Sequence, residues 1–216
     1  LVATGTTIPQ YLSGGDRSSL FAYLDAIRKE SAFDFLSLTD QNGRVWLRVS
    51  QPDRVRDDVS SISVVRAALS GRVAAATEVL SAESLNNEHP GLPARAHFRL
   101  VPTPMAKPLT QTEETSGMAL IAAAPVRGPD GRVLGVLYGG VLLNRNLGIV
   151  DRVWELISKG DRFNGQDVGS VTIFQKDLRI STTVKTADGE RAFGTRVSEA
   201  VHDAVLGRGQ TWRDRA

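Results

Sequence analysis

The sequence of 216 residues contains no cysteine, and that absence excludes several classes of function at once. Thiolate catalysis, zinc sites with cysteine ligands, disulfide bonds and covalently attached haem all require cysteine. Long apolar runs are also lacking, since the longest, Met118–Val126, is about half of what a membrane-spanning helix needs. The first residues show no basic stretch followed by an apolar one, so there is no signal-peptide pattern. We expect any membrane span to lie outside this chain.

No block of like charge stands out either. The 26 basic and 24 acidic residues are spread along the chain and leave a formal net charge of +2. Nucleic-acid patches and polybasic membrane anchors need clustered Lys and Arg, so this distribution argues against both. With 41% hydrophobic and 23% charged residues, the composition is typical of a globular protein with enough apolar material for a core.

Patterns that indicate catalysis are equally scarce. The three histidines, His89, His97 and His202, have no metal-ligand spacing, and no Gly-x-Ser-x-Gly elbow occurs. Gly135–Gly140 is rich in glycine, but it lies within an expected strand and lacks the Lys of a phosphate loop. We therefore predict no catalytic residue, no metal site and no cofactor.

Apolar periodicity and turn signals predict an α+β fold. Asp16 is a good N-cap for an amphipathic helix over 17–32. A hairpin of strands 35–39 and 45–49 follows, because Asp40–Gly43 contains the Asn-Gly pair that favours tight turns. The remaining expected elements are a short helix over 59–70, strands over 75–80, 118–126 and 133–143, a helix over 147–159 that stops at Gly160, strands over 170–174 and 179–184, and a short helix over 198–206.

Two further features concern the middle of the chain. Asp57 and Asp58 stand where capping side chains would satisfy the first N–H groups of the short helix over 59–70. The stretch from 84 to 116 is polar and rich in proline, so we interpret it as a long excursion that closes over a ligand.

The order of elements repeats after about 135 residues. The segments Thr39–Arg44 and Phe174–Arg179 occupy matching places within two strand pairs, and a short helix follows each pair. This repeat predicts tandem domains with antiparallel sheets, the second of them incomplete because its final hairpin is missing. The expected boundaries are an N-terminal helical segment at 1–34, a first domain at 35–146, a connecting helix and linker at 147–168, and the start of a second domain at 169–216.

Two groups of segments carry a resemblance to a known family. Gly135–Asn146 and Ile149–Arg152 form the first group, and Val171–Gln175, Arg179–Thr182, Asp188–Gly189 and Gly194–Ser198 form the second. The first group resembles the end of the membrane-distal half of a double Cache region, and the second resembles the start of its membrane-proximal half. The resemblance covers 35–216 and implies tandem PAS-like (Cache) domains. Such domains form the extracytoplasmic, periplasmic portion of bacterial inner-membrane sensor histidine kinases and chemoreceptors.

A local resemblance concerns ligand binding. The segment Leu47–Pro52 reads Leu-Arg-Val-Ser-Gln-Pro and is similar to the Leu-Arg-x-Ser-His-Pro segment of citrate- and fumarate-sensing kinases. The Arg and His of those kinases bind the ligand carboxylate, which implies that Arg48 has this role here and that Gln51 replaces the His. Those sensors carry another Arg on a later core strand, where this chain has Ile121. The resemblance thus favours a monocarboxylate or another small polar ligand over a dicarboxylate.

Five residues of the first domain are candidate ligand contacts, namely Arg48, Gln51, Ser50, Trp46 and Thr39. A guanidinium offers paired donors that match a carboxylate, and it remains charged in a pocket. Strand alternation puts Trp46 on the face of Arg48. The amide of Gln51 and the hydroxyls of Ser50 and Thr39 supply further hydrogen bonds. The alternatives are a solvated Arg48 and ordinary turn chemistry for the others.

Three residues of the second domain are weaker candidates. Arg179, Ser181 and Thr183 alternate onto one face, where they would line a vestigial or second pocket. Thr183 stands at the position that matches Arg48. The alternative, that these side chains only pack and hydrogen-bond locally, remains open.

These observations favour a sensor region that binds a small molecule, with a carboxylate as the expected ligand, and signals to a cytoplasmic kinase or a chemotaxis output. The alternative is a ligand-free dimerisation or partner-sensing module of such a receptor. We expect a homodimer, with the helix over 17–32 as a contact, and no nucleic-acid partner. A hydrolase or transferase on this scaffold would need a nucleophile and a base within hydrogen-bond reach, and the sequence shows no such pair.

Overall fold

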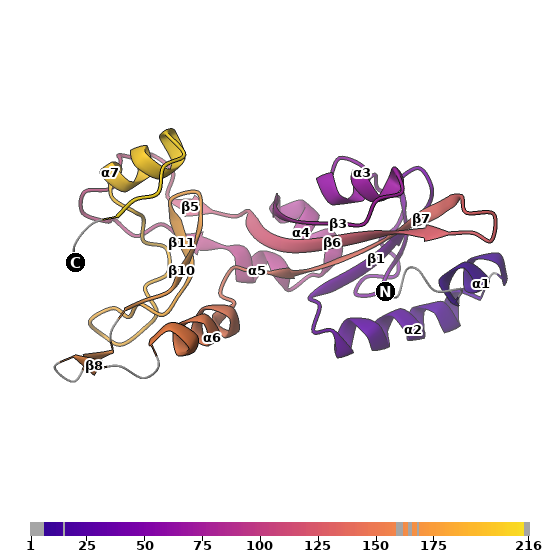
Figure 1. Ribbon diagram of the computed structural model, residues 1–216, viewed down its shortest axis with the longest axis horizontal. Coiled ribbons are helices and arrows are strands. Elements are labelled where there is room, and N and C mark those ends of the chain that lie inside the picture. Colours follow the sequence, from indigo (N-terminus) through magenta and orange to yellow (C-terminus); the bar gives the residue numbers. More distant parts are fainter. Residues whose placement is uncertain (1–6, 15, 159–161, 164–165, 168, 214–216) are drawn as a thin grey trace. The chain divides into compact units, whose positions relative to one another are not determined.

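The computed structural model describes residues 7–14, 16–158, 162–163, 166–167 and 169–213, and its contacts divide the chain into two compact units (Figure 1). The first unit comprises Leu1–Pro93 and Met118–Leu142, and the second comprises Ala94–Gly117 and Leu143–Ala216. The stretch 94–117 thus belongs to the second unit, whereas the boundaries expected from the sequence include it in the first.

The first unit is a five-stranded sheet with helices on both faces. Its strand order is β2-β1-β7-β6-β3, and the pairs β1–β2, β1–β7 and β6–β7 are antiparallel. The strands are β1 (Phe35–Thr39), β2 (Val45–Arg48), β3 (Ala74–Leu80), β6 (Gly117–Arg127) and β7 (Val133–Leu142). The helices are α1 (Thr7–Gly14) and α2 (Arg17–Glu30) on one face, and α3 (Ser63–Leu69) and α4 (Ala82–Glu88) on the other (Figure 1).

The apolar core of this unit lies between α2 and the sheet. Leu20 and Leu24 of α2 are fully buried and pack against Leu38 of β1 and Leu47 of β2. Burying one such side chain contributes about 1.5–3 kcal/mol. The helix begins as the sequence predicts, because the carboxylate of Asp16 accepts a hydrogen bond from the backbone N–H of Ser19 at 3.0 Å.

The β1–β2 hairpin contains a bulge that changes which side chains share a face. Leu38 stands opposite Leu47, but Thr39 stands opposite Val45, so Trp46 is an extra residue in the ladder. Trp46 packs against the core on the α2 side, where the guanidinium of Arg17 lies 5.7 Å from the ring centroid. The expectation that Trp46 shares the face of Arg48 is therefore wrong, because strict alternation fails at a bulge.

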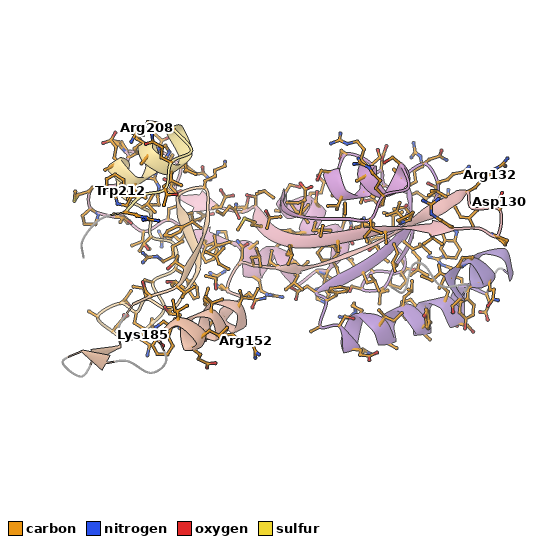
Figure 2. All side chains as sticks on the ribbon, in the orientation of Figure 1. Asp130, Arg132, Arg152, Lys185, Arg208 and Trp212 are labelled. Carbon is orange, nitrogen blue, oxygen red and sulfur yellow. The ribbon has the colours of Figure 1, made fainter. Side chains whose placement is uncertain are left out.

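The β6–β7 hairpin supplies the two long central strands. Asp130 and Arg132 lie at its tip and point away from the unit (Figure 2). Further along β7, a Cβ atom at Gly135 would lie 2.0 Å from the carbonyl oxygen of Thr39. Only glycine allows β7 to pass this close to the end of β1 without a backbone shift.

Two expectations about the helices of this unit change. The short helix α3 begins at Ser63 rather than near 59, and its N-cap Ile62 makes no side-chain hydrogen bond. Glu78 of β3 accepts from the backbone N–H of Ser63 instead. Asp57 and Asp58 thus do not cap α3, because Asp57 accepts from Arg48 and Asp58 accepts from the backbone N–H of Ser60. The helices α1 and α4 were not expected.

The second unit is built around the antiparallel pair of β10 (Thr172–Gln175) and β11 (Leu178–Thr182). Its other elements are the last residues of α5 (Leu92–Ala96), β4 (Phe98–Arg99), β5 (Glu113–Glu114), α6 (Leu147–Ser158), β8 (Arg162–Phe163), β9 (Gln166–Asp167), α7 (Glu199–His202) and a π-helical turn (Asp203–Gly207). The expected excursion thus folds into short helices and a small strand pair. The expected helix stop at Gly160 lies outside the described residues.

Candidate functional site

A hollow of about 240 Å³ opens on the sheet face of the first unit that lies opposite α2. The pairing register explains its composition, because Ser37 of β1 stands beside Arg48 of β2 on one side and Tyr138 of β7 on the other. Apolar side chains of Phe35, Val59, Ile62, Leu80 and Ile121 line the hollow together with Arg48, Asp57, Asp58, Ser61, Glu83, Ser84, Asn87, Glu88 and Tyr138. The hollow thus combines an apolar surface with a cluster of charged groups.

Arg48 is buried, with only 1% of its surface exposed, so the alternative of a solvated surface arginine is excluded. Its Nη1 donates to Oδ1 of Asp57 at 2.6 Å and to the carbonyl oxygen of Arg54 at 2.8 Å. Its Nη2 donates to Oδ2 of Asp57 at 2.6 Å and to Oε1 of Glu88 at 3.1 Å. Its Nε is buried and has no hydrogen-bond partner among the described residues. The guanidinium thus faces two carboxylates and keeps one unused donor.

Glu88, at the end of α4, is the buried partner of this cluster. Its Oε1 also accepts from the hydroxyl of Tyr138 at 2.7 Å, and its Oε2 accepts from the hydroxyl of Ser37 at 2.7 Å. A buried carboxylate is stable only when it is paired and hydrogen-bonded, and Glu88 meets both conditions. The network fastens α4 to three neighbouring strands, because Ser37, Arg48 and Tyr138 come from β1, β2 and β7.

The ionisation of these groups follows from their contacts. Burial by itself lowers the pKa of Arg48, but the hydrogen bonds that Arg48 donates to Asp57 and the charge of Glu88 outweigh burial and raise the pKa. The hydrogen bonds from Arg48 lower the pKa of Asp57 against the opposing effect of burial. Burial, together with the charge of Glu88, raises the pKa of Tyr138 well above its usual value. Arg48 and Asp57 are therefore charged, and the phenol of Tyr138 is a neutral donor near pH 7.

The other candidates of the first domain lie around this hollow without lining it. Gln51 donates its amide N–H groups to the carbonyl oxygens of Asn86 and Asn87 in the last turn of α4. The hydroxyl of Thr39 donates to the carbonyl of Asp40 at 2.8 Å. The hydroxyl oxygen of Ser50 is buried without a partner among the described residues. Trp46 packs on the opposite side of the sheet.

Among the lining residues, the three that bond to Arg48 or to Glu88 escaped the sequence reasoning, namely Asp57, Glu88 and Tyr138. Asp57 was interpreted as a helix cap, and Glu88 lay within the expected excursion. One signal was available for them. A buried arginine needs carboxylate partners, so placing Arg48 in a pocket already requires acidic residues nearby. The sequence did not tell which acids those were, because Glu88 lies 40 positions from Arg48 along the chain.

The candidates of the second domain have local partners. Arg179 lies with its guanidinium 5.6 Å from the ring centroid of Phe174, and burial lowers its pKa. The hydroxyl of Ser181 donates to the carbonyl of Asn146 at 2.8 Å, and that of Thr183 accepts from the N–H of Val171 at 2.9 Å. These contacts hold chain segments together.

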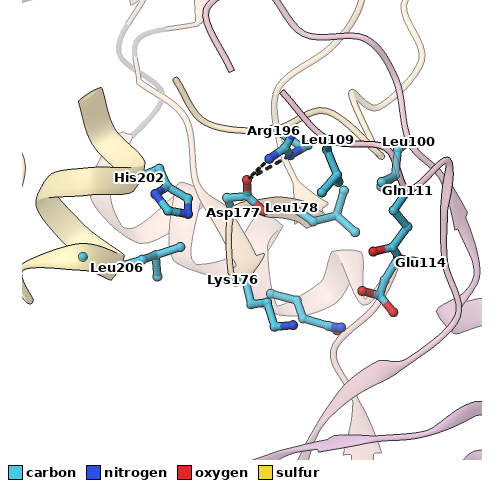
Figure 3. Close-up of a pocket in the computed structure, with 12 residues that line it drawn as sticks. Leu100, Leu109, Gln111, Glu114, Lys176, Asp177, Leu178, Arg196, His202 and Leu206 are labelled. Carbon is cyan, nitrogen blue, oxygen red and sulfur yellow. Dashed lines mark hydrogen bonds and ion pairs between the residues drawn. The ribbon is translucent and has the colours of Figure 1, made fainter. Parts of the chain in front are cut away.

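A larger hollow of about 470 Å³ lies elsewhere in the second unit, and none of these three candidates lines it (Figure 3). Asp177 and Arg196 form an ion pair of 2.6 Å at its centre. Leu100, Leu109, Leu178 and Leu206 give it apolar walls, with His202 and Lys176 at its edge. Because Asp177 already neutralises Arg196, this hollow has no unpaired buried cation.

Within the described ranges, no group of three or more His, Asp or Glu side chains is placed to hold a metal ion. A membrane-spanning helix is not found among these residues either, because none of their helices is both long and apolar enough.

Three solved structures are similar to this chain at low sequence identity. They are a domain of a sensory box/GGDEF family protein from Vibrio parahaemolyticus, the periplasmic domain of Vibrio cholerae LuxQ, and the extracellular domain of the histidine kinase vpHK1S-Z8. Their identities are 12%, 14% and 12%, and their TM-scores are 0.49, 0.48 and 0.47. The matches cover 85%, 95% and 85% of this chain, but it spans only 62%, 73% and 58% of theirs.

Family models give a clearer result. The model described as "Double sensory domain of two-component sensor kinase" matches residues 1–157, and the model described as "Single cache domain 3" matches residues 141–216. No curated protein sequence matches the chain. Since the first model spans well over half of the sequence, the chain belongs to the double Cache family of sensory domains found in two-component sensor kinases.

Proposed function

We propose that this chain is the sensing region of a transmembrane receptor and that a small molecule binds in the hollow around Arg48. The observation that carries the proposal is a buried guanidinium on the wall of an open pocket, with one of its two carboxylate partners, Asp57, 37% exposed. Charged groups held out of water beside a cavity are typical of binding sites. Family membership supports the proposal, because Cache domains are ligand-binding modules that are not catalytic.

The proposed ligand carries one carboxylate. The two Nη atoms of Arg48 form a fork that matches the two oxygens of a carboxylate, and its Nε is a buried donor in need of an acceptor. Ile121, fully buried on the wall of the hollow, offers a second anion no charge to pair with. A small apolar group fits there instead, so the geometry supports a monocarboxylate better than a dicarboxylate. In this proposal the other four candidates support the site without lining it. They are Gln51, Ser50, Trp46 and Thr39.

Signalling would follow from α4. Ligand binding shifts an equilibrium only as far as its affinity for two arrangements differs. Glu88 links α4 to Arg48, and Gln51 holds the last turn of the same helix, so a ligand at Arg48 acts on α4 directly. The output would be a cytoplasmic kinase or a chemotaxis protein, reached through membrane segments outside this chain. The domains at 35–146 and 169–216 would be the membrane-distal and membrane-proximal halves in the periplasm of a bacterium.

A homodimer is part of the same proposal. The apolar side chains Leu20 and Leu24 of α2 face their own sheet and are fully buried. A partner chain would therefore meet the polar face of α2, where Arg17 and Lys29 are exposed. Sedimentation of the chain at increasing concentration tests this directly, because a single monomer species at all concentrations would remove α2 as a contact.

One observation favours a second candidate, a ligand-free module that senses a partner protein. The charge of Arg48 is already compensated within the chain by Asp57 and Glu88. Such a cluster is complete without a ligand and would serve to hold α4 in place. This candidate predicts that no small molecule stabilises the chain.

Thermal unfolding against a panel of small carboxylates, amino acids and amines decides between the two. A ligand at 100 times its Kd adds about 2.7 kcal/mol of stability, which raises the midpoint by several degrees in a chain of this size. We expect a monocarboxylate to do so in the wild type and not in Arg48→Lys, which keeps the charge and loses the fork. Arg179→Lys in the second unit is the matched control and keeps the full shift. A flat panel contradicts the carboxylate proposal, and a shift that survives Arg48→Lys places the site elsewhere.

A further inference from the structure

The two carboxylates on Arg48 are held very differently. Glu88 is 4% exposed and accepts hydrogen bonds from Ser37 and Tyr138 as well as from Arg48. Asp57 is 37% exposed, and its two oxygens rest on the guanidinium with no other side chain as a donor. Glu88 is therefore fixed by three side chains, whereas among the described residues Arg48 is the one side chain that donates to Asp57.

The backbone that carries Asp57 is fixed. The N–H of Val45 donates to the carbonyl of Asp57 at 2.9 Å, and the N–H of Arg56 donates to the carbonyl of Val45 at 2.7 Å. Two residues later, the N–H of Val59 donates to the carbonyl of Gly43 at 3.0 Å. Backbone hydrogen bonds thus hold the loop to the first hairpin on both sides of Asp57. The side chain of Asp57 can leave Arg48 without breaking these backbone bonds, and because it is partly exposed it can move into solvent.

The contact that Asp57 makes is also the contact expected of a ligand. Both oxygens lie 2.6 Å from the two Nη atoms, which is the paired geometry of a bidentate arginine–carboxylate interaction. Arg48 itself is 1% exposed, so an incoming group cannot reach the Nη atoms while Asp57 covers them. The remaining neighbours of the guanidinium, Glu88 and the carbonyl of Arg54, are parts of the framework.

We propose that Asp57 occupies the carboxylate position of the ligand in the free protein and that its displacement determines which ligands bind. This inference rests on the proposed function and adds the basis of its selectivity. An anion with two paired oxygens replaces the lost contact in kind. A neutral acceptor such as an amide does not, because it has no charge to pair with the guanidinium and offers one acceptor oxygen where a carboxylate offers two. Asp57 thus excludes neutral molecules of the same shape.

The experiment compares propionate with its neutral isostere propionamide, using the full chain. Asp57→Asn weakens the internal competitor while Glu88 still balances Arg48. Asp58→Asn is the matched control, because Asp58 lines the same hollow with the same charge but bonds to the N–H of Ser60 instead of Arg48. Binding is followed by thermal unfolding and by the NMR signal of the Arg48 Nε–H group.

We expect the wild type to bind propionate and not propionamide. Asp57→Asn raises the affinity for propionate about tenfold, the effect expected for the loss of one charged competitor, while Asp58→Asn changes it less than about threefold. The wild type offers a readout that needs no variant. At pH 7, saturating propionate shifts the carboxyl ¹³C signal of Asp57 as its contact with Arg48 is lost.

Three outcomes overturn the inference. Equal gains in Asp57→Asn and Asp58→Asn would show that only the total charge of the hollow matters. Propionate binding that needs the Arg48 fork but is unchanged in Asp57→Asn, with a silent Asp57 carboxyl signal, would refute the exchange and leave the proposed function intact. Failure of Asp57→Asn to bind propionate at all would refute both, because the Nη atoms of Arg48 would then be open to a carboxylate and still hold none.

Discussion

The β1–β2 hairpin of the first unit and the β10–β11 hairpin of the second have a bulge at the same place but carry different chemistry. In the first, the register shifts between Leu38 and Thr39, and in the second it shifts between Ile173 and Phe174. Counting outward from the bulge, Ser37 pairs with Arg48 in the first hairpin, and Thr172 pairs with Thr182 in the second. Thr182, rather than Thr183, is therefore the counterpart of Arg48.

The two polar pairs show what the fold itself requires. Thr172 and Thr182 satisfy each other through a hydroxyl–hydroxyl hydrogen bond of 2.6 Å, and Thr182 is fully buried. Two small hydroxyl side chains are thus enough at this position of the ladder. In the first unit the same position carries a guanidinium with two carboxylates beside a hollow. Burying these charged groups costs more free energy than burying two hydroxyl groups. The fold therefore does not by itself explain why the first unit carries the charged groups of Arg48, Asp57 and Glu88.

The largest expected effect comes from removing the guanidinium. Arg48→Met leaves Glu88 buried without its counter-ion, and breaking a buried ion pair on one side costs about 3–5 kcal/mol. Arg179→Met, at the arginine of the second hairpin, loses only a half-buried contact with Phe174 worth about 1 kcal/mol. Urea unfolding followed by NMR signals of each unit separates the two values.

The double variant Arg48→Met/Glu88→Gln provides the control. It removes both charges together, so it should recover much of the stability lost in Arg48→Met. Equal losses in Arg48→Met and Arg179→Met would mean that the two arginines are equivalent and that the comparison between the hairpins is void.

A smaller effect is expected at Gln51. Its amide donates to two carbonyl oxygens in the last turn of α4, so Gln51→Ala should cost about 1 kcal/mol. The loss should be local, and the amide of His89, which closes α4 on the carbonyl of Leu85, should exchange faster with solvent. Ser181→Ala in the second hairpin is the counterpart, since it removes one hydrogen bond to Asn146 without touching a pocket. Unchanged exchange at His89 would show that Gln51 does not hold α4.

The smallest effect concerns pH. Arg48 lowers the pKa of Asp57 in the folded chain below its ordinary value of 3.8. A lowered folded-state pKa means that the ion pair stabilises the fold above about pH 4 and that this contribution is lost as the pH falls through the folded-state value. An NMR titration of the Asp57 carboxyl should therefore give a midpoint below 3.8, and the midpoint should rise in Arg48→Met/Glu88→Gln. A midpoint that is equal in both proteins would show that Arg48 does not hold Asp57.

The local elements of the first unit follow well from the sequence. Asp16 caps α2, and the turn at Asp40–Gly43 joins the two strands expected on either side. The helix α4 was missed because its polar residues and the prolines that follow it suggested an excursion, although Ser81 caps it by accepting from the N–H of Ser84. That cap was a visible signal. Within the second unit, the alternating pattern predicted a strand over 179–184, and β11 covers Leu178–Thr182.

The site was harder to predict for a physical reason. Arg48 was identified from its neighbours in the sequence, and it does line the hollow. Its partners depend on how distant segments meet, and no local pattern encodes that Glu88 would arrive from α4. The face of Trp46 depends on a bulge, which arises from the pairing of two strands and not from either strand alone. The pairing of Thr39 with Val45, and the bulge that goes with it, could therefore be learned only from the structure.

The bulge also sets rules for engineering this chain. Five residues, 40–44, connect the paired positions Thr39 and Val45, whereas four residues, 175–178, connect Phe174 and Arg179. Grafting a binding residue from one half to the other must therefore follow the pairing of residues across the strands instead of the spacing along the sequence. An arginine introduced at 182 would stand beside Thr172, as Arg48 stands beside Ser37. Deleting Trp46 would remove the extra residue and straighten the ladder, but Leu47 would still stand opposite Leu38 and Arg48 opposite Ser37, so Arg48 would keep facing the hollow. The bulge is therefore the place in this strand where a one-residue deletion changes no facing, and the contact of Trp46 with Arg17 is what the deletion would remove.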